Sequence, residues 1–338
     1  MQLEEIMNKS FLTSNGIVKI IKNNLGMIVV LLVMCIVLSF LSPEFLSANN
    51  FLTLFRQISD NIYIALGMSL VIILGGIDLS VGSVVAMSGI ITVSSIVNEG
   101  MPVAAAIALG LLGGLLCGLA SGFLIAVFDV PPFIITLAMM NVARGISYLW
   151  TNARSIRAVD PAFNTIGTGY LGVIPLPVVY SVILIIVFSF LLNKTTFGTY
   201  VYAIGGNREA AKLSGVPIKR TIVIVHTIST GMAAFSGIVL AARMYSGQPS
   251  VGEGYEMDAI TACVLGGISM TGGIGHISGM VIGAVIIGVI SNGLNLCNVS
   301  SYWQLVVKGI IVAIAIIFDK IKNSQGKIMI RKKEADKQ

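Results

Sequence analysis

A polar stretch lies between two strongly apolar segments, 175–192 and 221–242, and it reads Gly205-Gly206-Asn207-Arg208-Glu209-Ala210-Ala211-Lys212-Leu213-Ser214-Gly215-Val216-Pro217. Asn207 is a residue type that caps helix N-termini, Glu209 suits a first helical turn, and Gly215 suits the position after the last turn. The stretch therefore predicts a short helix at a membrane surface. Its basic residues place that surface on the cytoplasmic side.

The composition is that of a membrane protein. The chain has 338 residues, of which 56% are hydrophobic and only 11% are charged, and its mean hydropathy is +0.94. A soluble domain carries roughly 25% charged residues. The net charge of +6 comes from clustered basic residues and indicates membrane topology rather than nucleic-acid binding. The two histidines and four cysteines lack metal-type spacing, so we expect buried thiols and no metal site.

About ten apolar segments are candidates to cross a bilayer. They are 25–42, 61–77, 81–97, 102–127, 133–149, 175–192, 221–242, 258–270, 277–296 and 303–319. The segments 61–77 and 258–270 are the weakest candidates for full spans. We expect an all-α polytopic membrane protein with a tail over 1–24, a transmembrane domain over 25–319 and a basic tail over 320–338.

The distribution of basic residues supports this topology. If the N-terminus is cytoplasmic and every segment crosses, 15 of the 21 Lys and Arg lie inside and four lie outside. Both termini and the stretch 205–217 are then cytoplasmic. Two polar outer loops, 150–174, which is the longest, and 243–257, serve either as simple connections or as a landing surface for an external partner.

Two stretches resemble each other and predict a weak internal two-fold repeat. Leu74-Gly75-Gly76-Ile77-Asp78-Leu79-Ser80-Val81-Gly82 is echoed by Leu265-Gly266-Gly267-Ile268-Ser269-Met270-Thr271-Gly272-Gly273. Each follows one apolar segment and opens another that is rich in small residues. Such self-similarity is typical of transporters.

Three motifs carry a resemblance to a known family. Glu209-Ala210-Ala211 followed by Gly215 resembles the EAA-x3-G signature of ABC importer permeases. The wider pattern Gly-Gly-Asn-x-x-Ala-Ala-x-x-Ser-Gly-Val is similar to permeases of the ribose, xylose, arabinose and galactose class of sugar importers. Gly-Gly-Ile-Asp-Leu-Ser at 75–80 and Leu-Gly-Gly-x-x-x-x-Gly-Gly at 265–273 resemble the same class. The C-terminal half looks most like the ribose-type branch.

The resemblance implies that the short helix is a coupling helix, which docks into an ATPase subunit. The coupling residues that it implies are Gly205, Gly206, Asn207, Glu209, Ala210, Ala211, Ser214 and Gly215. It also implies a bacterial inner-membrane permease with three protein partners: an ABC ATPase with tandem nucleotide-binding domains, an extracytoplasmic sugar-binding protein and a second permease copy. The expected cargo is a monosaccharide, ribose first, with other sugars or autoinducer-2 as alternatives.

The chain itself is not expected to be an enzyme or to hold a cofactor. It has no G-x-x-x-x-G-K-[ST] phosphate-binding loop, so ATP and Mg²⁺ belong to the partner ATPase. An intramembrane enzyme would need a catalytic pair of residues, and none is evident. A different class of transporter, coupled to ions, would use Asp78 and Arg144 as a proton relay. The coupling-helix motif speaks against it.

Several polar residues lie in or near the predicted spans, where an unpaired charge costs about 2.5–3.5 kcal/mol or more. Asp78 precedes Ser80 and an apolar segment, so it either caps a helix, which we favour, or contacts substrate or a proton. Arg144 and Lys308 either pair with a carboxylate, reach the interface or line a pathway. The amides either bond helix to helix or hydrogen-bond a hydroxyl-rich solute; they are Asn141, Asn292, Asn295 and Gln304.

Overall fold

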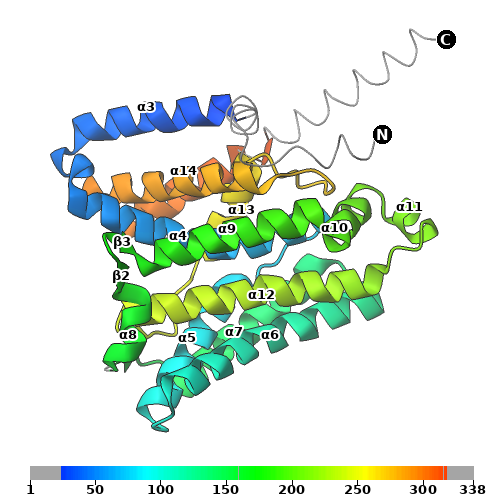
Figure 1. Ribbon diagram of the computed structural model, residues 1–338, viewed down its shortest axis with the longest axis horizontal. Coiled ribbons are helices and arrows are strands. Elements are labelled where there is room, and N and C mark those ends of the chain that lie inside the picture. Colours follow the sequence, from blue (N-terminus) through cyan, green and yellow to red (C-terminus); the bar gives the residue numbers. More distant parts are fainter. Residues whose placement is uncertain (1–23, 159, 315, 318–338) are drawn as a thin grey trace.

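The computed structural model describes residues 24–158, 160–314 and 316–317. Within these ranges the chain folds as a helical bundle (Figure 1). Its helices are α3 (Leu25–Leu41), η1 (Pro43–Leu46), α4 (Ala48–Leu74), α5 (Val81–Val97), α6 (Val103–Phe128), α7 (Pro132–Thr151), α8 (Pro161–Thr168), α9 (Leu176–Lys194), α10 (Thr196–Gly206), α11 (Arg208–Leu213), α12 (Ile218–Arg243), α13 (Tyr255–Leu265) and α14 (Ile277–Leu296). A further helix covers Ser301–Ile314. Except for Asn24, the predicted tails 1–24 and 320–338 lie outside the described residues.

The helical, polytopic character predicted from the sequence is confirmed. Six described helices are long and apolar enough to cross a membrane, namely α4, α6, α7, α9, α12 and α14. The helices α3, α5 and Ser301–Ile314 are apolar but shorter, and α13 has only 11 residues. Each predicted apolar segment lies at least partly on a helix, yet length and composition alone support six spans rather than ten.

Helix α4 is much longer than the weak segment predicted at 61–77. It has 27 residues and begins after Ser47, whose hydroxyl accepts the Asn50 N–H at 3.2 Å. It ends at Gly75, which has φ 95°. The sequence prediction was wrong about its start because Arg56 and Asp60 interrupt the apolar run. Each finds a partner in the fold, because Arg56 donates to the Thr168 carbonyl and Asp60 forms an ion pair.

Burial separates a core from a lipid-facing layer. The most apolar window of α4 is 89% buried, whereas those of α6, α7 and α9 are 28%, 17% and 22% buried. Helix α12 packs against α4, α5 and α6, and Figure 1 shows it running between α9 and α6. Apolar side chains exposed on α6, α7 and α9 are typical of surfaces in contact with lipid.

A row of glycines lets α6 approach α12 closely. Gly110, Gly114, Gly118 and Gly122 recur every fourth residue and all are buried. The last three face α12, whereas Gly110 packs mainly on Ser88 and Thr92 of α5. A Cβ on Gly118 would overlap the Thr230 hydroxyl and the His226 carbonyl, and would lie 2.7 Å from the Thr227 Cα. Membrane helices associate through such small-residue faces because lipid supplies no hydrophobic driving force between them.

Short strands organise the end of the bundle opposite α11. Strand β1 (Ile156–Arg157) pairs antiparallel with β4 (Ser246–Gly247), and β2 (Tyr170–Leu171) pairs with β3 (Ile174–Pro175). The β1–β4 pair joins the two predicted outer loops, 150–174 and 243–257. The two loops therefore form one connected surface rather than separate connections.

The four cysteines are free thiols, as the sequence indicated. Their expected burial is only partly correct. Cys263 is buried and Cys35 and Cys117 are half-buried, but Cys297 is exposed at the end of α14.

The glycine row predicts a sharp stability difference between two matched substitutions. Gly118→Ala should lower the free energy of unfolding by about 1–3 kcal/mol, since backbone atoms must move to accept the added methyl group. Gly145→Ala in α7 is the control, because nothing lies within 4 Å of a Cβ built there. Melting temperatures of the two variants in detergent would check this. Equal melting temperatures would contradict the proposed role of the glycine row.

Candidate functional site

A short helix lies where the sequence predicts one. Helix α11 spans Arg208–Leu213, and the Asn207 side chain caps it by accepting the Ala210 N–H at 3.0 Å. Gly215 follows with φ 77°, a conformation that glycine adopts without strain. The Val216 N–H returns to the Ala211 carbonyl at 3.0 Å and closes the turn. Sequence signals for both ends of the helix were therefore correct.

Helix α11 projects from one end of the bundle (Figure 1). Of its predicted coupling residues, Ala211 is buried against the protein. The others on and around the helix are exposed, and they are Asn207, Glu209, Ala210, Ser214 and Gly215. Leu213, which the sequence analysis did not select, is 89% exposed at the end of the helix. An exposed leucine inside a polar stretch was the signal that pointed to it.

Gly205 and Gly206 differ from the other predicted coupling residues. They end α10, the helix before α11, and Gly206 is exposed with open space around it. Gly205 instead packs on the end of α4, where an added Cβ would overlap the Ile73 carbonyl oxygen. The same Cβ would lie 2.6 Å from the Gly273 nitrogen. Gly205 therefore contacts both of the turns that were predicted as repeats.

These two turns are joined directly. The Gly273 N–H donates to the Ile73 carbonyl at 2.8 Å, which links the loop after α13 to the end of α4. A Cβ on Gly272 would lie 2.7 Å from the Gly205 carbonyl oxygen. We name this meeting point of Gly205, Gly272, Gly273 and Ile73 the glycine junction.

Helix α10 has a second link to the same loop. The Tyr202 hydroxyl donates to the Gly275 carbonyl at 2.8 Å. Burial raises the pKa of Tyr202, so its hydroxyl keeps the proton that it donates. The α10–α11 unit is thereby held to the core by a hydrogen bond and by close backbone packing.

The predicted repeat turns share local geometry. Each has a glycine with positive φ just after its helix, although at different positions: Gly75 ends α4 with φ 95°, whereas its counterpart Gly266 ends α13 with φ −69° and Gly267 follows with φ 78°. In the first, the Asp78 carboxylate accepts from the Ser80 N–H at 3.0 Å; in the second, the Ser269 hydroxyl accepts from the Thr271 N–H at 3.3 Å. The likeness is confined to the turns, and a repeat of whole halves stays a prediction.

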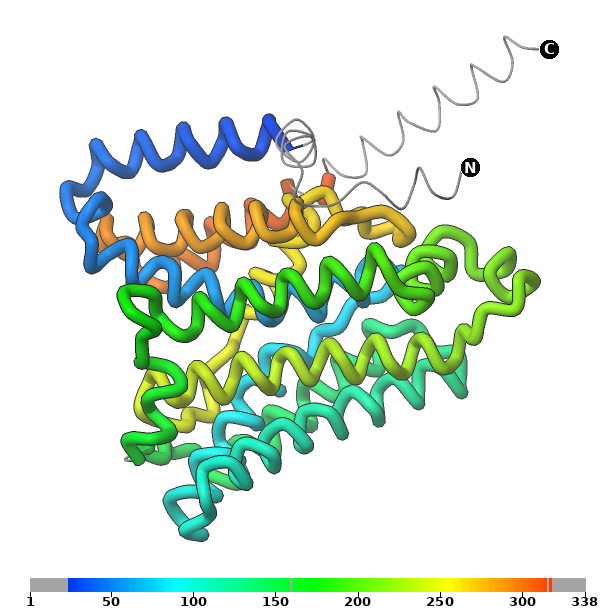
Figure 2. Tube along the Cα trace, in the orientation of Figure 1, coloured from blue at the N-terminus to red at the C-terminus, as the bar shows by residue number. Residues whose placement is uncertain are grey.

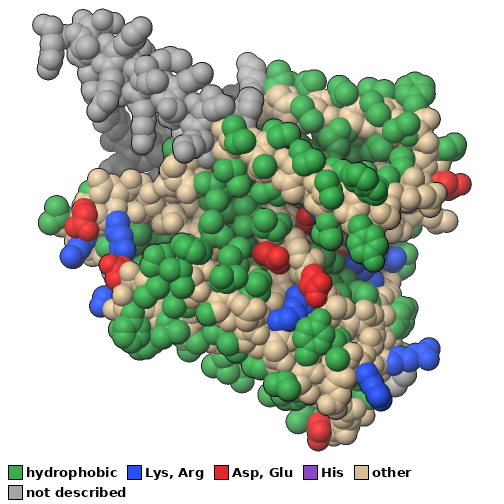
Figure 3. Space-filling view, turned by 180° about the vertical axis from the view of Figure 1, so that it is seen from behind, with side chains coloured by type: hydrophobic (Ala, Val, Ile, Leu, Met, Phe, Trp, Pro, Cys, Tyr) green, Lys and Arg blue, Asp and Glu red, His purple; other side chains and the backbone are tan. Residues whose placement is uncertain are grey.

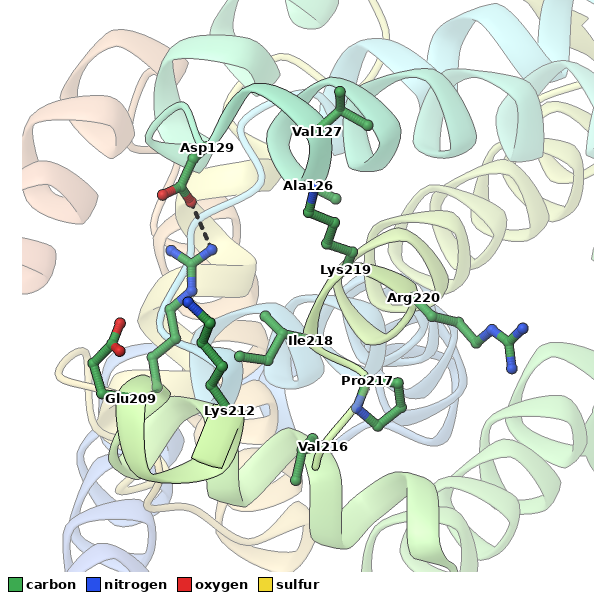
Figure 4. A pocket seen from close by; sticks show the side chains of 11 residues that line it. Ala126, Val127, Asp129, Glu209, Lys212, Val216, Pro217, Ile218, Lys219 and Arg220 are labelled. Atoms are coloured by element: carbon green, nitrogen blue, oxygen red, sulfur yellow. Dashed lines mark hydrogen bonds and ion pairs between the residues drawn. The ribbon is translucent and has the colours of Figure 1, made fainter. Parts of the chain in front are cut away.

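A pocket of about 730 Å³ lies beside α11, between the end of α6 and the start of α12 (Figure 4). It is lined by Ala126, Val127, Asp129, Arg208, Glu209, Lys212, Val216, Pro217, Ile218, Lys219 and Arg220. Arg208 pairs with Asp129 at 2.6 Å, but these side chains are 48% and 70% exposed. Such a pair is worth about 0–1 kcal/mol, so it holds α11 only weakly against α6. The pocket has a basic surplus that suits an acidic partner.

Asp78 is fully buried and tied into the core. Its carboxylate accepts from the Ser80 hydroxyl at 2.6 Å and the Ser229 hydroxyl at 2.9 Å, so it connects the start of α5 to α12. Arg144 donates to the Pro249 and Val251 carbonyls at 2.5 and 2.8 Å. The two residues share no ion pair within the part of the chain that the structure describes. The geometry favours the structural role of Asp78 and does not assemble an Asp78–Arg144 relay.

The four predicted amides make bonds within the protein. Asn292 exchanges two hydrogen bonds with Asn50, at 2.8 and 3.1 Å, which ties α14 to α4. Asn295 accepts from Gln304 at 2.8 Å. Asn141 is exposed and donates to the Leu137 carbonyl of its own helix at 3.1 Å. The helix-to-helix alternative therefore fits Asn292 and Asn295 better than a solute contact.

The structure reveals two ion pairs that the sequence analysis missed. Arg243 pairs with Asp60 at 2.6 Å, and Lys308 pairs with Asp258 at 2.7 Å. The aspartates are 4% and 6% exposed, while the cations keep 21% and 25% exposure. Lys308 thus pairs with a carboxylate, one of the outcomes expected for it. Carboxylates within apolar segments were the available signal for both pairs.

Comparisons with known proteins place the chain in a family. A profile of the family described as "Branched-chain amino acid transport system / permease component" matches residues 50–316. The ribose import permease protein RbsC of Bacillus subtilis (strain 168) is 42% identical over 306 residues, covering 90% of this chain and 95% of the relative. RbsC of Escherichia coli (strain K12) is 40% identical over 302 residues, covering 87% and 93% of the two chains.

An arabinose permease is equally similar. The L-arabinose transport system permease protein AraH of Escherichia coli (strain K12) is 42% identical over 297 residues, covering 88% of this chain and 90% of the relative. No solved structure gives a match. Because the family profile covers most of the chain, the protein belongs to this family of membrane permease components.

Proposed function

We propose that the chain is the membrane-spanning permease subunit of an ATP-driven ABC importer that carries ribose into the cell. The observation that carries this proposal is about 40% identity to ribose import permeases over nearly the whole chain. A multi-pass inner-membrane location follows from the family and the six apolar spans. The chain is not itself an enzyme, since the permease leaves ATP hydrolysis to a separate subunit.

The proposed topology has ten crossings and places both termini in the cytoplasm. Six long helices supply most of them, and α3, α5, α13 and Ser301–Ile314 supply the rest. The short members need not each span the full bilayer, because broken helices meet other protein at membrane depth. The basic-residue asymmetry of the sequence supports this orientation, with α11 inside and the β1–β4 pair outside.

Two kinds of partner follow from the family, and their arrangement is part of the proposal. Inside, α11 docks on an ATPase subunit with tandem nucleotide-binding domains that hold ATP and Mg²⁺. Outside, a sugar-binding protein docks on the surface that β1 and β4 join. A second copy of the permease completes the channel, because two ATP sites call for two coupling helices.

The proposed mechanism is alternating access driven from α11. When the ATPase domains close, α11 moves together with α10, because only Asn207 separates the two helices. The glycine junction passes that movement to the end of α4 and to the loop after α13. The helix pairs α4–α5 and α13–α14, each of which is interrupted by one of these glycine-rich turns, then move together.

Arabinose is the second candidate cargo. The arabinose permease AraH matches the chain as well as the ribose permeases do in percentage identity. The coupling machinery is the same for both cargoes, so a transport assay must separate them.

Uptake into proteoliposomes is the direct test of this function. With the ATPase inside and the sugar-binding protein outside, we expect ribose uptake that requires ATP and all three components. Uptake of arabinose but not ribose would change the assigned cargo and leave the assignment as an ABC importer intact. Uptake driven by a proton gradient without ATP would refute the ABC assignment.

Leu213 should carry much of the docking energy. Burying a leucine against a partner stabilises a complex by about 1.5–3 kcal/mol, so Leu213→Asp should weaken ATPase association about tenfold or more. The control is Leu171→Asp in β2, since Leu171 is 63% exposed at the opposite end of the bundle. Co-purification of the ATPase measures the effect, and equal yields with both variants would argue against docking through Leu213.

The glycine junction gives a prediction about coupling rather than docking. Gly205→Ala should leave ATPase association intact yet reduce uptake several-fold and abolish stimulation of ATPase activity by the loaded binding protein, because its methyl group overlaps the Ile73 carbonyl. Gly206→Ala is the matched control, since open space surrounds that position. Uptake and stimulated ATP hydrolysis would be measured side by side. Wild-type uptake and wild-type ATPase stimulation in Gly205→Ala would show that the glycine junction does not couple α10 to the spans.

A further inference from the structure

The segment that follows β4 turns back into the bundle instead of staying at its end. A Cβ on Gly247 would lie 3.1 Å from the Ile90 Cα of α5, whereas one on Gly252 would overlap the Gly82 carbonyl oxygen. Residues 248–254 therefore run beside about eight residues of α5, a descent of about 12 Å at 1.5 Å per residue. Figure 2 shows the chain after α12 turning inward toward α13.

The bottom of this segment lies at membrane depth. Helix α5 ends at Val97, just before the polar residues Asn98 and Glu99. Gly82 is about 22 Å below that end along the helix, within a hydrocarbon layer about 30 Å thick. Non-helical backbone is stable at such depth only where protein surrounds it or where it lines a water-filled cavity.

Arg144 satisfies the backbone of this segment. Its guanidinium group, on α7, donates to the carbonyls of Pro249 and Val251. These bonds hold the segment between α5 and α7 and leave the Arg144 side chain partly exposed. Arg144 is therefore a positioning residue for residues 248–254.

Carboxylates follow at once in the first turn of α13. Asp258 pairs with Lys308, which keeps 25% exposure. Glu256 lies beside Gly82 of α5 and is partly exposed, and it forms no ion pair among the residues that the structure describes. Its carboxylate and the Gly252 carbonyl both lie against Gly82, and Arg144 holds the carbonyl of the preceding residue, Val251. Glu256 is thus a partly exposed acceptor next to the segment that Arg144 holds.

Tyr255 adds an aromatic ring to this group. It is the first residue of α13, directly before Glu256 and three residues before Asp258, and its ring is partly buried against the core. The space-filling view shows acidic and basic side chains gathered near the middle of one face, among hydrophobic and uncharged ones (Figure 3). Charged side chains that are partly exposed at membrane depth indicate a water-filled path rather than contact with lipid.

We propose that Tyr255, Glu256 and the Asp258–Lys308 pair, held in place by Arg144 and residues 248–254, form the site through which a neutral monosaccharide passes. This inference rests on the proposed transport function and names its site. Sugar hydroxyls both donate and accept hydrogen bonds, so they suit a carboxylate, an ammonium group and a phenol together.

Both cations of the site already have partners in the protein. Lys308 pairs with Asp258, and Arg144 donates to two backbone carbonyls. A neutral polyol is able to exchange hydrogen bonds with these groups without bringing a further charge into the membrane. The ring of Tyr255 offers the apolar face that a sugar ring also needs.

The test is thiol labelling of Glu256→Cys in the full complex with its ATPase. The background chain has Cys35, Cys117, Cys263 and Cys297 replaced by alanine, and it must first show ATP-dependent ribose uptake. A charged, membrane-impermeant methanethiosulfonate reagent is then applied with excess free ribose or with sucrose at equal osmolarity. If the background imports another sugar, that sugar replaces ribose here, so failure of the cargo assignment is detected separately.

We expect ribose to slow labelling of Glu256→Cys at least about threefold, as occupancy of two thirds of the sites requires. Two control variants represent a thiol that is fully accessible to the reagent and one that is inaccessible. Arg154→Cys, in the exposed outer loop, should label equally with either sugar, and Leu116→Cys, on the lipid-facing side of α6, should not label. Labelling of Glu256→Cys without ribose protection would overturn the sugar site. No labelling at all would overturn the water-filled path.

Discussion

A bilayer offers no water to backbone N–H and C=O groups, so each interruption of a helix at membrane depth must find its partners within the protein. Among the residues that the structure describes, non-helical backbone of this kind lies at 75–80, 248–254 and 266–276. The first and third meet through the Gly273 N–H and the Ile73 carbonyl. The second is held by a guanidinium group. The positions of these interruptions determine where the bundle is able to move and where it is able to accept a polar solute.

Glycine makes the direct backbone contact between the first and third of these interruptions possible. At the glycine junction, backbone meets backbone with no side chain between, so a displacement of α10 is not absorbed by rotamer changes. Close-packed interiors transmit strain because they contain few voids. A coupling helix that touched the core only through long side chains, as in the exposed Arg208–Asp129 pair, would lose most of its displacement before reaching the spans. In the proposed mechanism, the junction is therefore the contact through which so short a helix as α11 would act on a large bundle.

Local signals in the sequence predicted local structure well. The ends of α11 followed from Asn207 and Gly215 because capping depends on neighbouring residues only. The start of α4 could not be predicted in this way, because Asp60 is stabilised by Arg243, which lies far away in the sequence and close only in the fold. The site at α13 was hidden for the same reason. In the proposed sugar site only Tyr255, Glu256 and Asp258 lie together in the sequence, and Arg144 and Lys308 join them only in the fold. Each charge in an apolar segment is nevertheless a clue to a partner elsewhere.

The charges at membrane depth explain why such a permease works with a separate binding protein. Each cation there is held by a carboxylate or by backbone carbonyls, so the protein has already satisfied most of its strong hydrogen-bonding groups. A passing sugar exchanges bonds with these groups instead of gaining many new ones, and its net binding free energy is therefore small. Weak binding is an advantage on a pathway, because a tightly held solute would not leave. Selection among sugars then has to occur before the membrane, in a site that is free to bind tightly.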